Sequence, residues 1–89
     1  MRLSILVAAL ASRADMSAAL FAELDRQLIP GEVELVVYED DGKVPSGRKR
    51  NWLMDNSNGL YFAFVDDDDL VSEDYVEQIL RATKNGPDV

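Results

Sequence analysis

The stretch LSILVAA, residues 3–9, decides how the rest of the chain can fold. It is apolar almost throughout, which is typical of a strand that is covered on both faces, as in a parallel sheet. Together with Arg2 and Ala9-Leu10-Ala11, the stretch also resembles a short secretory signal with a small-residue cleavage site. The charged leader is minimal, and cleavage would remove one of three strong strand candidates. We therefore expect a buried first strand, Leu3 to Ala9, in a cytoplasmic protein.

Two further strands and three helices are predicted along the chain. VELVVY (33–38) is rich in β-branched residues, and LYFAFV (60–65) is a second apolar run. Ser12 is a candidate N-cap for the first helix, and Ser72 for the last. From apolar spacing and turn residues, we expect helices over residues 15–28 and 47–56, and from Ser72 until the pattern fades at Asn85.

Strands and helices alternate along the chain with short connections. Such alternation predicts parallel strands joined by right-handed crossovers. We expect one α/β domain over residues 1–89, a Rossmann-like three-layer unit. Its short parallel sheet would have the strand order 2-1-3 and carry three helices. No internal repeat or linker divides the chain.

Composition excludes several classes of function. The net charge is −8, with 17 acidic and 9 basic residues, which argues against nucleic-acid partners and against an anionic membrane surface. There is no cysteine and no histidine, so a thiolate zinc site and a histidine base are excluded. A bound metal would have oxygen ligands, which favours magnesium, manganese or calcium. No stretch reaches the roughly 18 apolar residues of a membrane span.

Acidic clusters follow the second and third predicted strands. Asp40-Asp41-Gly42 closes one strand, and Asp66 to Asp69 closes the other. Because parallel strands end at one sheet edge, both clusters should lie beside the crevice above the first strand, where such sheets bind ligands. Four adjacent carboxylates repel one another, and a divalent cation would relieve that repulsion. The alternatives are a solvated acidic loop and an ordinary turn in which Gly42 supplies a positive φ.

Three cations open the second predicted helix in the segment Ser46-Gly47-Arg48-Lys49-Arg50. Cations at a helix N-terminus suit a phosphate, although a solvated basic helix face explains them equally well. Carboxylates can bind a metal and sugar hydroxyls, and the nearby lysine and arginines can bind phosphate. Together they favour a nucleotide-diphosphate site. We expect Trp52 in the core rather than at a sugar platform, and Phe62 and Phe64 in strand packing.

Taken in order, these segments resemble the first half of a family 2 glycosyltransferase of the GT-A fold. The resemblance covers nearly the whole chain. It implies a truncated GT-A fold and transfer of a glycosyl group from a nucleotide-sugar, most often a UDP-sugar, to an acceptor hydroxyl. The matching residues are Asp40, Asp41, Gly42, Gly47, Lys49, Arg50, Asn51, Gly59, Phe64 and Asp66 to Asp69.

The resemblance also implies roles for individual residues. Asp41 would face the nucleobase, and Asp66 or Asp67 would contact the ribose or the donor sugar. Asp68 would ligate Mn²⁺ or Mg²⁺, which would bridge to the diphosphate. Lys49 or Arg50 would hold phosphate or order the base-binding loop. The implied nucleotide- and donor-binding set is Asp40, Asp41, Lys49, Arg50, Asp66 and Asp67, and no catalytic residue is implied.

The chain departs from the family pattern in three places. The usual extra strand between Asp40-Asp41-Gly42 and the segment Gly47 to Asn51 is absent, so the connecting loop is short. Ala8 to Ala11 supply no side-chain polarity where relatives hold the base with Thr or Tyr. The family's second half, with the acceptor pocket and the base of inverting members, has no counterpart before Val89. We therefore expect a donor-site domain. The alternative is a non-catalytic fragment that binds metal or nucleotide, or that forms a homodimer through an exposed sheet edge or apolar face.

Overall fold

The computed structural model describes residues 1–84 and contains a three-stranded parallel sheet with three helices. The strands lie in the order β2-β1-β3, so the first strand is central. The predicted α/β class, strand order and number of helices are confirmed. The expected end of the last helix near Asn85 lies outside the described residues. The elements are β1 (Leu3–Leu10), a 3₁₀ turn η1 (Ala11–Arg13), α1 (Ala14–Gln27), β2 (Val33–Asp40), α2 (Ser46–Asp55), β3 (Tyr61–Asp66) and α3 (Tyr75–Lys84).

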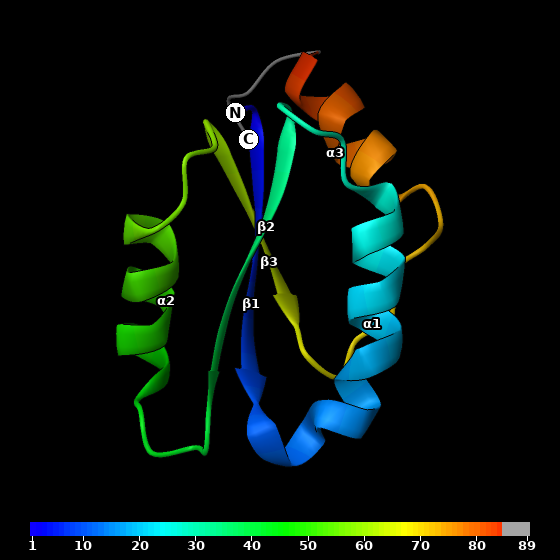
Figure 1. Cartoon of the computed structure of the whole chain (residues 1–89). Coiled ribbons are helices and arrows are strands. Elements are labelled where there is room, and N and C mark those ends of the chain that lie inside the picture. The colour runs from blue at the N-terminus through cyan, green and yellow to red at the C-terminus, as the bar shows by residue number, and fades with distance from the viewer. Residues whose placement is uncertain (85–89) are drawn as a thin grey trace.

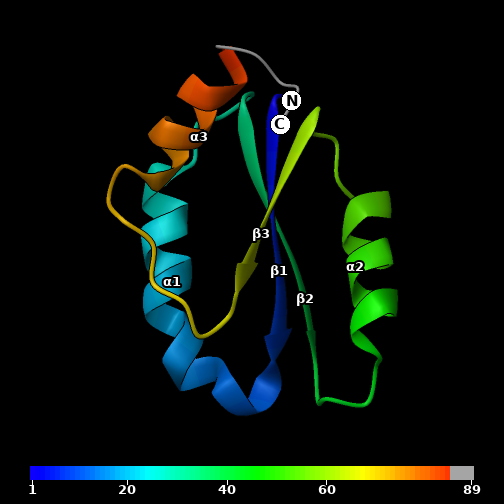
Figure 2. The same cartoon turned by 180° about the vertical axis from the view of Figure 1, so that it is seen from behind.

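The helices form two layers with the sheet between them. Figures 1 and 2 show α1 and α3 on one face of the sheet and α2 on the other. Strand β1 is therefore buried on both faces, as its apolar sequence predicts. Alternate residues such as Ile5 pack with Leu24 of α1 and Leu80 of α3 in the main core. Leu6 points to the opposite face, where Leu53 of α2 is also fully buried.

Ser4 joins the three strands at the amino end of the sheet. Its buried hydroxyl donates to Glu34 Oε2 on β2 at 2.6 Å and accepts the Gly59 N–H at 2.8 Å. A Cβ at Gly59 would lie only 2.5 Å from Ser4 Oγ and 2.6 Å from Ser4 N, so this position requires glycine. The close approach fixes where β3 begins, and hence where the aspartates at its other end lie.

The predicted N-cap at Ser12 is wrong. Residues Ala11–Arg13 form η1, and α1 begins at Ala14 with Arg13 as its N-cap. The reason is a contact between distant segments. The Leu10 N–H and the Arg13 guanidinium both bind Asp67, which holds the chain in a tight turn before the helix starts.

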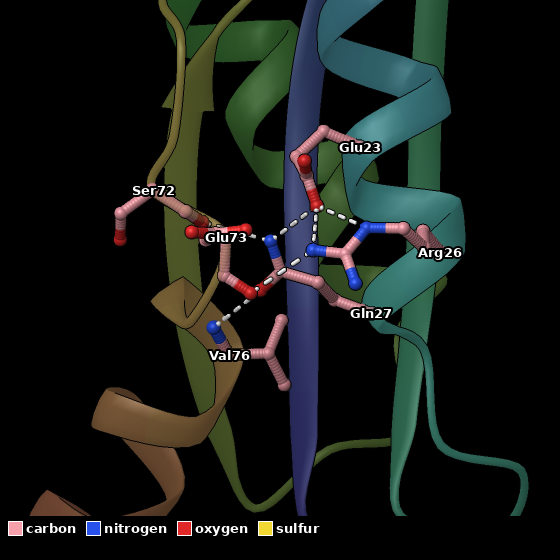
Figure 3. Close-up of polar contacts among 6 residues, drawn as sticks. All are labelled: Glu23, Arg26, Gln27, Ser72, Glu73 and Val76. Carbon is pink, nitrogen blue, oxygen red and sulfur yellow. Dashed lines mark hydrogen bonds and ion pairs between the residues drawn. The ribbon is translucent and has the colours of Figure 1, made fainter.

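The predicted N-cap at Ser72 is also wrong, because α3 begins at Tyr75. Figure 3 shows how α1 holds the segment before it. Gln27 donates from Nε2 to the Ser72 carbonyl at 2.8 Å, and its Oε1 accepts the Val76 N–H at 2.9 Å. Arg26 donates to the Glu73 carbonyl at 3.0 Å. The Gln27 side chain of α1 thus accepts a hydrogen bond from an N–H at the start of α3, where the sequence predicts a cap by the neighbouring Ser72.

Several aromatic side chains are more exposed than the sequence predicts. Trp52, expected in the core, is 41% exposed and lies edge-on to Tyr38 with ring centroids 5.0 Å apart. Phe62 and Phe64 are 44% and 40% exposed. The cause is the position of α2, which packs on β1 and β2 and leaves this face of β3 uncovered in the described structure. Within residues 1–84, no helix is long and apolar enough to cross a membrane.

Candidate functional site

A cavity of about 600 Å³ lies at the carboxyl edge of the sheet, above the central strand. Ala8 and Leu10 of β1 line it with apolar surface, and Phe64 does so from β3. The turn after β2 and the start of α2 add further lining residues, as does the loop after β3. This is the place where the strand order reverses, and open α/β sheets bind their ligands there. The cavity therefore lies where the sequence predicts a site.

Asp40 and Lys49 pair with each other beside this cavity. Asp40 Oδ1 lies 2.5 Å from Lys49 Nζ, and the two side chains are 9% and 8% exposed. Oδ1 has no hydrogen bond of good geometry within residues 1–84, so the contact is chiefly an ion pair. Oδ2 accepts the Val44 N–H at 3.0 Å. The contact with Lys49 lowers the pKa of the Asp40 carboxyl, and burial opposes that shift only in part.

This pair gives two of the predicted ligand-binding residues a clear structural task. Lys49 is in the first turns of α2, and Asp40 is the last residue of β2. Their contact closes the loop between the two elements, with Val44 held in the middle. Of the two roles implied for Lys49, ordering a loop fits this geometry better than holding phosphate. A buried cation that already has a partner adds little net charge to the cavity.

Asp67 is the buried member of the acidic run after β3. It is 3% exposed, its Oδ2 accepts the Leu10 N–H at 2.9 Å, and its Oδ1 accepts from Arg13 at 2.9 Å. Both carboxylate oxygens are therefore engaged by the protein. This leaves Asp66 as the better placed of the two candidates for the ribose or sugar contact. Asp67 instead ties the loop after β3 to the end of the central strand.

Asp66, Asp68 and Asp69 form an exposed group of carboxylates on the same loop. One oxygen from each residue lies within 4.8 Å of the others. No lysine or arginine lies within ion-pair distance of them in the part of the chain that the structure describes. Burial, and secondarily the charge of Asp69, raise the pKa of the nearby Tyr75 phenol. The group thus concentrates negative charge that the protein itself leaves unpaired.

Arg50 is the exposed cation of the cavity. Its guanidinium carbon lies 4.4 Å from the centre of the Phe64 ring, which holds it by a cation–π contact. Within residues 1–84 it has no carboxylate partner, unlike Lys49. It lines the same cavity as Asp66 and Asp68. An unpaired guanidinium next to a potential cation site is a suitable ligand for a phosphate oxygen.

Asp41 lies apart from these residues. Its side chain is 62% exposed, and its nearest cation is Lys43, with an Nζ–Oδ2 distance of 3.6 Å. It does not line the cavity, although Gly42 beside it does, with φ at +93°. The positive φ is the one that the turn interpretation of Asp-Asp-Gly requires. A contact between Asp41 and the nucleobase of a ligand stays a prediction.

The structure adds one residue that the sequence interpretation missed. Arg13 lines the cavity from η1, directly after the central strand. The available signal was positional, because polar residues just beyond the carboxyl end of a central parallel strand lie at the ligand crevice. Arg13 was overlooked because it lies four residues past Ala9, the expected end of the first strand. The structure brings it together with Lys49, Arg50, Asp66, Asp67 and Asp68 around one cavity.

The chemistry of this site is that of polar binding. It offers hard oxygen ligands on one side and guanidinium groups on two others, over a partly apolar floor. Comparison of the chain with protein-family models, curated proteins and solved structures gave no match. Function must therefore be argued from the site itself.

Proposed function

We propose that this chain is the donor-site domain of a metal-dependent glycosyltransferase and binds a nucleotide-diphosphate sugar. The observation that carries the proposal is the cavity above the central strand, lined by exposed Asp66 and Asp68 and by Arg50, which has no ion-pair partner among residues 1–84. Diphosphate needs both a cation and hydrogen-bond donors, and a sugar or ribose needs acceptors for its hydroxyls. The ordered sequence segments that resemble the first half of a family 2 glycosyltransferase support the same proposal.

A divalent metal fits the carboxylates of this site. Asp66, Asp68 and Asp69 would hold it, since they are the oxygen donors whose ligand atoms lie within 4.8 Å of one another. An all-oxygen set suits Mg²⁺ or Mn²⁺ better than softer metals. When bound, the metal would supply positive charge that stabilises the leaving nucleoside diphosphate. Exposed acidic groups of this kind also occur without metal, so the trio supports the proposal only together with the cavity.

The protein's own residues would then divide the remaining work. Arg50, held against Phe64, would donate to a phosphate oxygen. The Asp40–Lys49 pair would keep the loop after β2 in place. Asp66 would accept from a sugar or ribose hydroxyl, and Asp41 remains the proposed contact to the base. The carboxylates that line the cavity are Asp66, Asp67 and Asp68, and the proposal assigns them to the ligand, to Arg13 and to the metal rather than to a base for an acceptor hydroxyl.

The test is a titration with UDP, with and without Mn²⁺, followed by amide NMR shifts at neutral pH. We expect metal-dependent shifts at the turn after β2 and at Asp66 to Asp69, and their loss in Asp68→Asn. Asp25→Asn removes an exposed carboxylate on α1 and is the matched control, which should behave like wild type. No shift at millimolar UDP and Mn²⁺ would contradict the proposal. The diamagnetic Mg²⁺ serves for residues that Mn²⁺ broadens.

A second candidate function, a self-associating module, has an observation of its own. Strand β3 pairs only with β1 among the described residues, so its outer edge is unpaired. Beside it, Leu60 is 78% exposed, and Phe62 and Phe64 are about half-exposed. Such an edge invites pairing with a second copy of the chain. A concentration-dependent dimer that Phe62→Lys abolishes, without any nucleotide binding, would favour this function over the first.

A further inference from the structure

Arg13 occupies a position that the proposed function does not yet use. It is the last residue of η1, directly beyond the central strand, and its side chain is 43% exposed. It lines the same cavity as Lys49 and Arg50 of α2. Its only hydrogen bond in residues 1–84 is from one terminal nitrogen to Asp67 Oδ1, at 2.9 Å. A guanidinium carries five N–H donors, so most of them remain available to a ligand.

Asp67 fixes the direction in which Arg13 presents these donors. The carboxylate is buried, and the Leu10 N–H anchors its second oxygen at 2.9 Å. Because that N–H belongs to the backbone of the central strand, Asp67 has little freedom to move. Arg13 is therefore held from one side by a fixed partner, while its other side faces the cavity.

The same contact decides which kind of ligand atom Arg13 suits. Its charge is balanced by Asp67, so the pair presents N–H donors with little net positive charge. Arg50, in contrast, has no carboxylate partner within the described residues, and it is the better ligand for an anion. The cavity that Arg13 lines also has apolar surface from Ala8 and Leu10 of the central strand, which suits a flat ring rather than a hydrated phosphate.

We propose that Arg13, positioned by Asp67, donates hydrogen bonds to an uncharged acceptor on the nucleobase of the ligand, a ring carbonyl or ring nitrogen, and not to its phosphates. This inference rests on the proposed function, because it assigns the base end of the same nucleotide site. It makes Arg13 a residue that determines base specificity, and Asp67 the residue that positions it.

The test compares two probes on two variants by isothermal titration calorimetry in the presence of Mn²⁺. UDP contains the base and the diphosphate, whereas inorganic pyrophosphate contains the diphosphate alone. We expect Arg13→Gln to weaken UDP binding about tenfold, the loss of one or two hydrogen bonds, and to change pyrophosphate binding less than twofold. Arg81→Gln is the matched control, because Arg81 is exposed on α3 and, within residues 1–84, its ion pair is with Glu77.

A second pair of measurements separates specificity from folding. Arg13→Lys keeps the charge beside Asp67 but loses the planar donor fork, and it should weaken UDP binding in the same direction if Arg13→Gln does not fold. Asp67→Asn leaves Arg13 without its counter-charge, and we expect pyrophosphate to bind a few-fold more tightly. A merely structural role for Asp67 would not strengthen the binding of any probe.

The outcomes separate the inference from the function beneath it. Equal losses for UDP and pyrophosphate in Arg13→Gln would mean that Arg13 binds phosphate, which overturns the inference alone. Unchanged UDP affinity in folded Arg13 variants would also overturn it alone. If wild-type protein binds neither Mn²⁺–UDP nor Mn²⁺–pyrophosphate, both the proposed function and this inference fail.

Discussion

Asp67 and Asp68 are neighbours in the chain, but the structure places them in opposite surroundings. Asp67 is 3% exposed and is bonded to the Leu10 N–H and to Arg13. Asp68 is exposed and lies with Asp66 and Asp69, and no lysine or arginine of the described residues lies within ion-pair distance of it. The same contrast recurs after β2, where Asp40 is buried against Lys49 and Asp41 is solvent-exposed. One carboxylate of each cluster thus stabilises the protein, and its neighbours are available to a ligand.

This division of the carboxylates explains why a run of like charges is tolerated after β3. A tight turn, with the Asp69 N–H bonded to the Asp66 carbonyl at 3.1 Å, sends consecutive side chains in different directions. Only one of the four carboxylates is turned inward, where Arg13 neutralises it. The other three are separated from it and are solvated. Four predictions follow from this contrast between buried, paired carboxylates and exposed, unpaired ones.

The largest effect is expected from breaking the buried pair after β2. Lys49→Met leaves the Asp40 side chain, which is 9% exposed, without its cation, and we expect the largest loss of unfolding free energy among these variants. Lys43→Met is the control, because Lys43 pairs with exposed Asp41 at 3.6 Å and should cost less than about 0.5 kcal/mol. Urea unfolding followed by circular dichroism measures both. Equal losses would show that burial does not distinguish the two pairs.

A somewhat smaller effect is expected when a cation joins the exposed group. Mn²⁺ should raise the unfolding free energy by about 2.7 kcal/mol at one hundred times its dissociation constant. The reason is that the metal binds carboxylates gathered in the folded state only. Differential scanning fluorimetry with Mn²⁺, and with Na⁺ at matched ionic strength, measures the shift. The comparison breaks down if Asp68→Asn responds to Mn²⁺ as strongly as the wild type does.

Within the acidic run, two neighbouring substitutions should differ in their effects without metal. Asp67→Asn removes the counter-charge of Arg13, and we expect a loss of about 1–3 kcal/mol in unfolding free energy. Asp68→Asn should be neutral or slightly stabilising, within about 0.5 kcal/mol, because it relieves repulsion at an exposed site. Chemical unfolding in the presence of EDTA measures both variants. A destabilised Asp68→Asn would mean that this carboxylate, too, has a structural partner.

The smallest difference between wild type and a variant is expected in how the unfolding free energy changes at acid pH. The contact with Lys49 holds the pKa of Asp40 below its ordinary value of 3.8. A carboxyl with a lowered pKa contributes stability above that ordinary value, and the contribution is lost as the pH falls through the lowered one. Unfolding free energy should therefore decline in acid, and Asp40→Asn should decline less steeply. Urea unfolding midpoints of wild type and Asp40→Asn, measured between neutral pH and pH 3, test this prediction. If the midpoints of the two proteins fall in parallel with pH, the prediction is wrong.

Glu34 contributes to the same acid decline and must be separated from Asp40. Burial alone would raise the pKa of Glu34, but hydrogen bonds from Ser4 and Asn58 outweigh it and lower the pKa. Its stabilising contribution is therefore also lost in acid. Because Glu34 is at the amino edge of the sheet, its loss should be unchanged in Asp40→Asn. A Glu34→Gln variant provides the comparison curve.

Much of the architecture could be predicted because it depends on local patterns. The apolar run in β1 needs cover on both faces, and alternating strands and helices then require a parallel sheet. Strand and helix bounds differ from the expected ones by at most two residues for β1, β2, β3, α1 and α2. The start of α3 could not be predicted, because its first N–H groups are satisfied by Gln27, 49 residues away from Val76 in sequence.

The candidate site was only partly predictable for the same physical reason. Parallel topology requires the two acidic clusters to share an edge, so their neighbourhood follows from the sequence. Which carboxylate turns inward depends on the backbone direction in a turn and on a cation from another segment. Neither is encoded in spacing along the chain, and Arg13 was missed because its partner, Asp67, is 54 residues away.

Residue patterns along the chain predict the fold class, the strand order and the sheet edge at which charged residues gather, because hydrophobic burial follows residue periodicity. How the charges at that edge are divided between buried pairs and exposed groups depends on contacts between distant segments. The tertiary structure pairs Asp40 with Lys49 and Asp67 with Arg13, and leaves Asp66, Asp68, Asp69 and Arg50 facing solvent. The reason is that burying a charge is costly unless a partner lies within a few ångströms, and only the folded chain brings such partners together.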